Sequence, residues 1–180
     1  METFDDMNIL IVDDEEDIRL IITELLKPLG AHIFEAGNGR LALEILSKER
    51  IDLAILDIKM PEMDGIDLLR HMAHTHPNIV SIMLTAYGGK EQVKAALKMN
   101  AFDFLEKPIE ELVLVNRVVN GLHKSKNKKL LDMIIEEFLL ESCTELTPAQ
   151  FANMKMEDKN RVLSAGLTLI KIKNIKRSAA

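Results

Sequence analysis

Side chains that could carry out phosphoryl chemistry stand at the ends of short apolar segments. Asp13 and Asp14 follow the apolar segment 7–12, and Asp57 follows the segment 52–56. Thr85 comes after the segment 79–84, and Lys107 comes after the segment 101–105. Three clustered carboxylates repel one another unless a hard cation lies among them, and Mg²⁺ prefers few carboxylates, waters and phosphate oxygens. A lysine and a threonine beside such a cation would bind a phosphoryl group. These residue types point to phosphoryl transfer to or from an acidic residue.

The elements that must position these side chains follow an alternating pattern. The five apolar runs predict strands over 7–12, 32–36, 52–56, 79–84 and 101–105. Four segments between these runs, and a fifth after Pro108, have apolar residues at helical spacing and are predicted to be helices. Five strand–helix pairs predict an α/β fold with a parallel sheet covered on both faces. Right-handed crossovers then bring every strand's carboxyl end to one rim, where ligands bind.

Four sequence blocks give this chain a family resemblance. They are Val12-Asp13-Asp14, Leu56 to Gly65, Leu84-Thr85-Ala86 and Phe104 to Pro108. In this order and at these strand ends, they resemble the receiver domain of two-component response regulators, over residues 5–123. The resemblance implies a flavodoxin-like five-stranded parallel sheet of order 2-1-3-4-5, flanked by five helices.

The resemblance also implies a phosphorylation site. Asp57 would be the nucleophile that accepts a phosphoryl group from the phosphohistidine of a sensor histidine kinase or a histidine phosphotransfer protein. Asp13 and Asp14 would hold Mg²⁺ together with Asp57, with Asp14 the more direct ligand. The backbone carbonyl of Lys59 would complete the protein ligands.

Further roles follow from the same resemblance. Thr85 would donate to one phosphoryl oxygen, and Lys107 would pair with another. We expect the Lys107–Pro108 peptide bond to be cis, since proline makes that isomer accessible. Phe104 would be the aromatic switch that turns inward when Thr85 moves. Tyr87 at the mouth of the site would slow hydrolysis of the phosphoryl group.

Taken together, the first 123 residues are identified as a receiver that catalyses only its own phosphorylation and dephosphorylation. Phosphorylation would change its association with a partner or with itself. A phosphorelay intermediate that passes the phosphoryl group onward remains an alternative. A metal-dependent phosphatase is disfavoured because no separate substrate pocket is implied.

Three other patterns have simpler interpretations. The run Gly37 to Ala42 matches a dinucleotide fingerprint, but it follows the second strand instead of the first. The three histidines at 71, 74 and 76 lack metal-ligand spacing and suit a solvated helix end. We interpret the acids at 15–17 as residues that complement the dipole of a following helix.

The charge changes sign near residue 123. Residues 1–123 hold 22 acidic and 12 basic side chains, a net charge of −10, whereas residues 124–180 carry +4. We therefore divide the chain into a receiver, 1–123, and a helical extension, 124–180, with helices near 128–141, 147–154 and 157–177. Because 123–129 lacks apolar residues, we prefer a hinge or exposed turn there to a helix that continues from the receiver.

The role of the extension stays open. A segment for partner docking or homodimerisation is our preferred hypothesis. A transcriptional regulator that binds DNA through the carboxyl-terminal helices is the alternative, which the modest positive charge does not favour. No catalytic output motif is present.

Composition narrows the remaining classes. The chain has 180 residues and is 47% hydrophobic, so it can bury a core. One cysteine, Cys143, excludes an internal disulfide framework. The absence of a long apolar run or a signal-like start leads us to expect a cytoplasmic protein with no membrane partner.

Overall fold

The computed structural model describes residues 3–85, 99, 101–141, 153 and 155. The chain divides into two units, Met1–Ser125 and Lys126–Ala180. The strands are β1 (Asn8–Val12), β2 (His32–Ala36), β3 (Leu53–Asp57), β4 (Val80–Thr85) and β5 (Asp103–Glu106). The helices are α1 (Glu16–Leu26), the 3₁₀ turn η1 (Lys27–Leu29), α2 (Gly39–Leu46), α3 (Gly65–Thr75) and α5 (Glu111–Glu141). Each predicted strand is present, with ends that shift by at most two residues.

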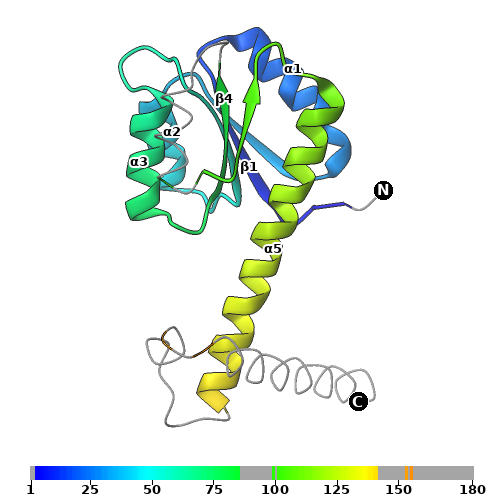
Figure 1. Ribbon diagram of the computed structural model, residues 1–180, viewed down its shortest axis with the longest axis vertical. Helices are drawn as coiled ribbons and strands as arrows, with labels where there is room; N and C mark the ends of the chain where they lie inside the picture. The colour runs from blue at the N-terminus through cyan, green and yellow to red at the C-terminus, as the bar shows by residue number, and fades with distance from the viewer. Residues whose placement is uncertain (1–2, 86–98, 100, 142–152, 154, 156–180) are drawn as a thin grey trace. The chain divides into compact units, whose positions relative to one another are not determined.

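The sheet confirms the predicted topology. Its order is β2-β1-β3-β4-β5, and all neighbouring pairs are parallel. Every residue of β3 and β4 is buried, as expected for central parallel strands covered on both faces. Because all the strands run in one direction, their carboxyl ends share one rim (Figure 1).

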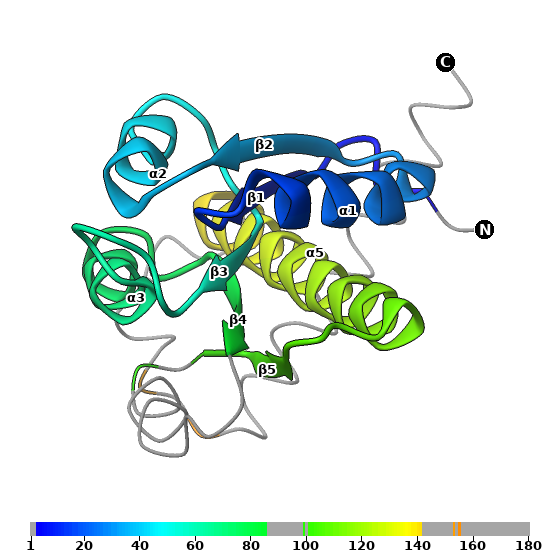
Figure 2. The same cartoon turned by 90° about the horizontal axis from the view of Figure 1, so that it is seen from above.

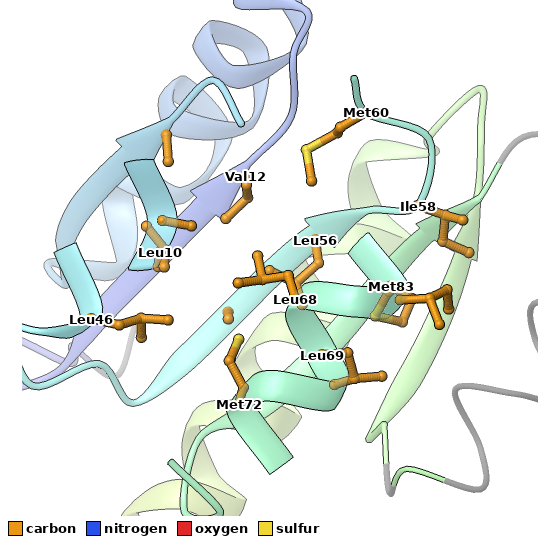
Figure 3. Close-up of a cluster of buried hydrophobic side chains, with 14 of the residues drawn as sticks. Leu10, Val12, Leu46, Leu56, Ile58, Met60, Leu68, Leu69, Met72 and Met83 are labelled. Atoms are coloured by element: carbon orange, nitrogen blue, oxygen red, sulfur yellow. The ribbon is translucent and has the colours of Figure 1, made fainter. Parts of the chain in front are cut away.

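Two apolar layers enclose the sheet. Helices α2 and α3 cover one face, and α1 and α5 cover the other (Figure 2). Alternate residues of β1 separate into the two layers: Leu10 lies in the α2–α3 layer, and Ile9 and Ile11 lie in the α1–α5 layer. Figure 3 shows the first layer, where Leu68 and Met72 of α3 lie near Leu56. Because both faces of the sheet are packed, the positions of the strand ends that form the rim are fixed by the core.

Helix α5 corrects one expectation. The structure has a single helix over Glu111–Glu141, so the hinge or turn predicted over 123–129 is wrong. Leu122 and Ser125 are buried, and the Lys124 ammonium lies 4.7 Å from the centre of the Phe102 ring. No glycine or proline occurs between Gly121 and Pro148, and lysine has a good helix propensity. A polar stretch can therefore stay helical without apolar residues.

Several expectations fall on residues outside the described part of the chain. They are the helix after Gly88-Gly89, Tyr87, Cys143 and the helices over 147–154 and 157–177. Within the described residues, no helix combines the length and the apolar character that a membrane span needs.

Candidate functional site

The rim at the carboxyl ends of the strands gathers the predicted chemical groups. Asp57 is the last residue of β3 and Thr85 the last of β4, while Asp13 follows β1 directly. The three residues are only 4%, 8% and 0% exposed. Lys107 follows β5, and its backbone N–H donates to the carbonyl of Thr85 at 2.8 Å. Four segments distant in sequence thus meet at one place.

Lys107 joins the acidic groups. Its Nζ lies 2.8 Å from Asp57 Oδ1 and 2.8 Å from Asp13 Oδ2. A longer ion pair, at 3.4 Å, reaches Glu15 Oε1. The Lys107–Pro108 peptide bond is cis, which confirms that expectation. One ammonium therefore neutralises part of the charge of three carboxylates.

Burial changes the ionisation of this cluster. Burial raises the pKa of Asp57 above its ordinary value of 3.8, because removal from water disfavours the carboxylate. The hydrogen bond and charge of Lys107 act in the opposite direction without cancelling this effect. For Lys107, burial alone would lower the pKa, but its bonds to Asp13 and Asp57 outweigh burial and raise the pKa. Lys107 is therefore a permanent cation beside a partly desolvated carboxylate.

The loop after β3 fixes the backbone of Asp57. Gly65 begins α3, and its N–H donates to the carbonyl of Ile58 at 3.0 Å. A Cβ at Gly65 would lie 2.0 Å from the Asp57 carbonyl oxygen, so only glycine permits this approach. Asp64 caps α3 by accepting the Asp67 N–H at 2.7 Å. The Lys59 backbone N–H also hydrogen-bonds the Asp57 carboxylate.

The loop after β1 shapes the acidic pair. Asp13 Oδ1 accepts the Glu15 N–H at 3.0 Å, so both carboxylate oxygens of Asp13 are engaged. Asp14 is exposed. Arg19 of α1 donates to the carbonyl of Asp13 at 2.8 Å and to that of Asp14 at 3.4 Å. The acidic pair therefore sits on a backbone held from the side of α1.

Two of these contacts were not foreseen from the sequence. Glu15 was interpreted only as a helix-terminal acid, yet it lies within ion-pair distance of Lys107. Arg19 was not considered at all. No local pattern marks Glu15, while Arg19 could have been suspected as a lone basic residue in the acidic start of a helix.

The remaining predicted residues lie further from this cluster or meet it only through the backbone. Phe104 is the partner of Met83 in the β4–β5 register. It is partly buried and packs against the α2–α3 layer. The side chain of Lys59 is exposed.

The donor set is compatible with a divalent cation. No group of three His, Cys, Asp or Glu side chains within the described ranges is close enough to form a metal site by itself. Mg²⁺, however, usually binds through one or two carboxylates and keeps several waters. Asp13 and Asp57 both approach the same ammonium, and the exposed Asp14 is adjacent. These hard oxygen donors fit Mg²⁺.

Comparison with known proteins identifies the family. A family model described as the response regulator receiver domain matches residues 9–119. The chain belongs to the response regulator receiver family. A receiver domain from Clostridium thermocellum is 33% identical, with a TM-score of 0.63, and is aligned over 69% of this chain and 98% of that one.

Relatives with curated descriptions differ in length. Sporulation initiation phosphotransferase F of Bacillus subtilis is 41% identical over 102 residues, which are 57% of this chain and 82% of that protein. The cyclic di-GMP phosphodiesterase of Thermotoga maritima is 32% identical over 144 residues, 77% of this chain but 39% of the relative. The response regulator protein PilR of Pseudomonas aeruginosa is 40% identical, and the match spans 23% of its length. The similarity to the longer relatives therefore covers less than half of each.

Proposed function

We propose that this receiver is phosphorylated on Asp57 in a Mg²⁺-dependent reaction and acts as a switch in a two-component signalling system. The observation that carries the proposal is the contact between Asp57 Oδ1 and Lys107 Nζ at 2.8 Å. The Asp57 side chain is only 6% exposed. A desolvated carboxylate next to a fixed cation can attack an electrophilic phosphorus atom while the cation offsets the charge that develops.

In the proposed reaction, an oxygen of Asp57 forms a bond to phosphorus as the phosphorus–nitrogen bond of a phosphohistidine breaks. The electron pair of the broken bond returns to the imidazole of the donor, which is a sensor histidine kinase or a histidine phosphotransfer protein. Lys107 exchanges its contact with the Asp57 carboxylate for one with a phosphoryl oxygen. The hydroxyl of Thr85 donates to another phosphoryl oxygen, because Thr85 ends the neighbouring strand.

Asp13, Asp14, Asp57 and the backbone carbonyl of Lys59 would hold the Mg²⁺. When bound, the metal supplies positive charge that brings the anionic phosphoryl group close to the carboxylates. Asp13 already has both oxygens engaged, by Lys107 and by the Glu15 N–H, and is therefore oriented before any ligand arrives. This preorganisation favours the proposed role.

The test is labelling with a small phosphodonor such as acetyl phosphate. The wild-type protein should take up one phosphoryl group per chain with Mg²⁺ and none with EDTA. Asp57→Asn should take up none, while Asp67→Asn, which removes an exposed carboxylate from α3, should behave as the wild type. Borohydride reduction should convert the labelled aspartate to homoserine at position 57. Uptake by Asp57→Asn would contradict the proposal.

A phosphorelay intermediate is the second candidate. The Bacillus subtilis relative is named a phosphotransferase, and the match covers 82% of its length. We propose as a test incubation of the labelled protein with an unphosphorylated histidine phosphotransfer protein. Transfer of label onto that protein favours the relay, whereas loss of label only by hydrolysis favours the switch.

For the rest of the chain, we propose that residues 124–180 form a segment for partner docking or homodimerisation. Their net charge of +4 contrasts with −10 for residues 1–123. Size-exclusion chromatography with and without beryllofluoride, an acyl-phosphate mimic, tests this proposal. A change in apparent mass that depends on residues 124–180 is expected, and an unchanged monomer would exclude dimerisation.

A further inference from the structure

The guanidinium of Arg19 connects three parts of the fold. It extends from α1, and its side chain is 16% exposed. Nη1 donates to the backbone carbonyl of Asp13 at 2.8 Å and more weakly to that of Asp14 at 3.4 Å. Nε lies 3.5 Å from Glu35 Oε2, on the edge strand β2. Arg19 thus links the loop after β1 to the edge of the sheet.

Glu35 is itself held in place. The hydroxyl of Thr23, one helical turn after Arg19, donates to Glu35 Oε1 at 2.8 Å. One oxygen of Glu35 therefore binds Thr23 and the other faces Arg19. The pair of α1 residues and the β2 carboxylate form a unit that fixes where the guanidinium lies.

This arrangement is not the one that stability alone would favour. Burying a guanidinium is costly unless its donors are well paired. Arg19 Nε is buried and makes no hydrogen bond within the described part of the chain. The shortest hydrogen bond of Arg19 goes to the backbone carbonyl of Asp13, whose carboxylate is buried. The geometry therefore favours a role in placing the loop.

The position of that loop matters for the site. The Asp13 carboxylate reaches Lys107 and the Glu15 N–H only if the peptide groups at 13 and 14 keep their orientation. Arg19 binds the carbonyls of both peptide groups and so resists their rotation. Without it, we expect the Asp13 carboxylate to sample orientations in which it no longer reaches Lys107.

We infer that Arg19 is a positioning residue for the acidic pair, anchored by Glu35 and Thr23, and that divalent-cation binding depends on it. This inference rests on the proposed function for the cation itself. Groups that orient metal ligands without touching the metal typically contribute 10- to 100-fold to metal affinity.

The first measurement is Mg²⁺ affinity by isothermal titration calorimetry on the full chain. Arg19→Gln should weaken binding about ten-fold or more. Arg19→Lys should recover part of this loss, because an ammonium can still reach one carbonyl. Glu35→Gln keeps the acceptor for Thr23 but removes the charge facing Arg19, and should give a smaller loss. Arg40→Gln is the matched control, since Arg40 is an exposed α2 residue paired only loosely, at 3.8 Å, with Glu44.

The second measurement needs no metal. Amide hydrogen exchange in EDTA should accelerate at residues 14–16 in Arg19→Gln and Glu35→Gln, while β3 and β4 keep their protection. If Arg19→Gln fails to fold, Glu35→Gln and Thr23→Val decide the question. Wild-type affinity and wild-type exchange at residues 14–16 in these variants would overturn the inference. A wild-type protein that takes up no phosphoryl label would instead overturn the proposed function, and the exchange data would still decide the role of Arg19.

Discussion

The ammonium of Lys107 and the carboxylate of Asp57 lie 2.8 Å apart at the buried end of β3. The same ammonium binds Asp13 at an equal distance. A single cation therefore stands between two buried carboxylates that would otherwise repel each other. This relationship makes the stability of the domain depend on the groups of its proposed site.

Removal of the shared cation should destabilise the fold. Lys107→Met leaves Asp13 and Asp57 buried without a counter-charge, and we expect a loss of about 2–3 kcal/mol in the free energy of unfolding at pH 7 in EDTA. The loss is smaller than for a fully buried pair because the Lys107 side chain is 19% exposed. Urea denaturation measures it. The exposed Lys48→Met should change stability by less than about 0.5 kcal/mol. In the Lys107→Met background, Asp13→Asn should restore stability; a further loss would contradict this explanation.

Replacement of the proposed nucleophile should stabilise the metal-free fold. Burial raises the pKa of Asp57 above 3.8, so the folded state holds this proton more tightly than the unfolded state does. As the pH rises from 3.8 through the folded-state pKa, the wild type loses stability that Asp57→Asn keeps. Thermal unfolding in EDTA should give similar melting temperatures for the wild type and Asp57→Asn below pH 3.8. At neutral pH, Asp57→Asn should have the higher melting temperature. A less stable variant at neutral pH would mean that the Lys107 contact outweighs burial.

The close approach of α3 to β3 should tolerate no side chain. Gly65→Ala places a Cβ 2.0 Å from a backbone oxygen of Asp57, and the backbone must shift. We expect a loss of about 2–3 kcal/mol in unfolding free energy and reduced phosphoryl uptake. Gly37→Ala is the control, because its nearest neighbour would be Arg19 Nη1 at an ordinary 3.6 Å. Equal stabilities of the two variants would show that the loop after β3 is freely adjustable.

The unforeseen acid near the site should slow phosphorylation. Glu15 Oε1 lies 3.4 Å from Lys107, where it competes for the ammonium and repels an anionic donor. Glu15→Gln should increase the rate of uptake from acetyl phosphate by about two- to five-fold at low salt, and less at high salt. Glu16→Gln removes the same charge from an exposed position one residue further along. If both variants accelerate uptake equally, general charge accounts for the effect and the contact with Lys107 does not.

Much of the fold was determined by local sequence. Apolar runs of strand length alternate with helical spacing, and buried parallel strands need no polar face, so the strands and their order in the chain could be predicted from the pattern alone. The continuation of α5 through residues 123–129 could not be predicted. A lack of apolar residues indicates that a helix is exposed to solvent, but it does not indicate that the helix ends.

The sequence by itself determined that the side chains of four residues could meet, because parallel strands bring their carboxyl ends to one rim. These residues are Asp13, Asp57, Thr85 and Lys107. Only the tertiary structure decided that Lys107 binds both carboxylates and that Glu15 is a third partner. It also decided that Arg19 of α1 binds the carbonyl of Asp13 in the loop after β1. Those contacts join residues whose separation in sequence carries no period or motif. They depend on side-chain directions and on distances across the sheet, which are set only when the layers pack.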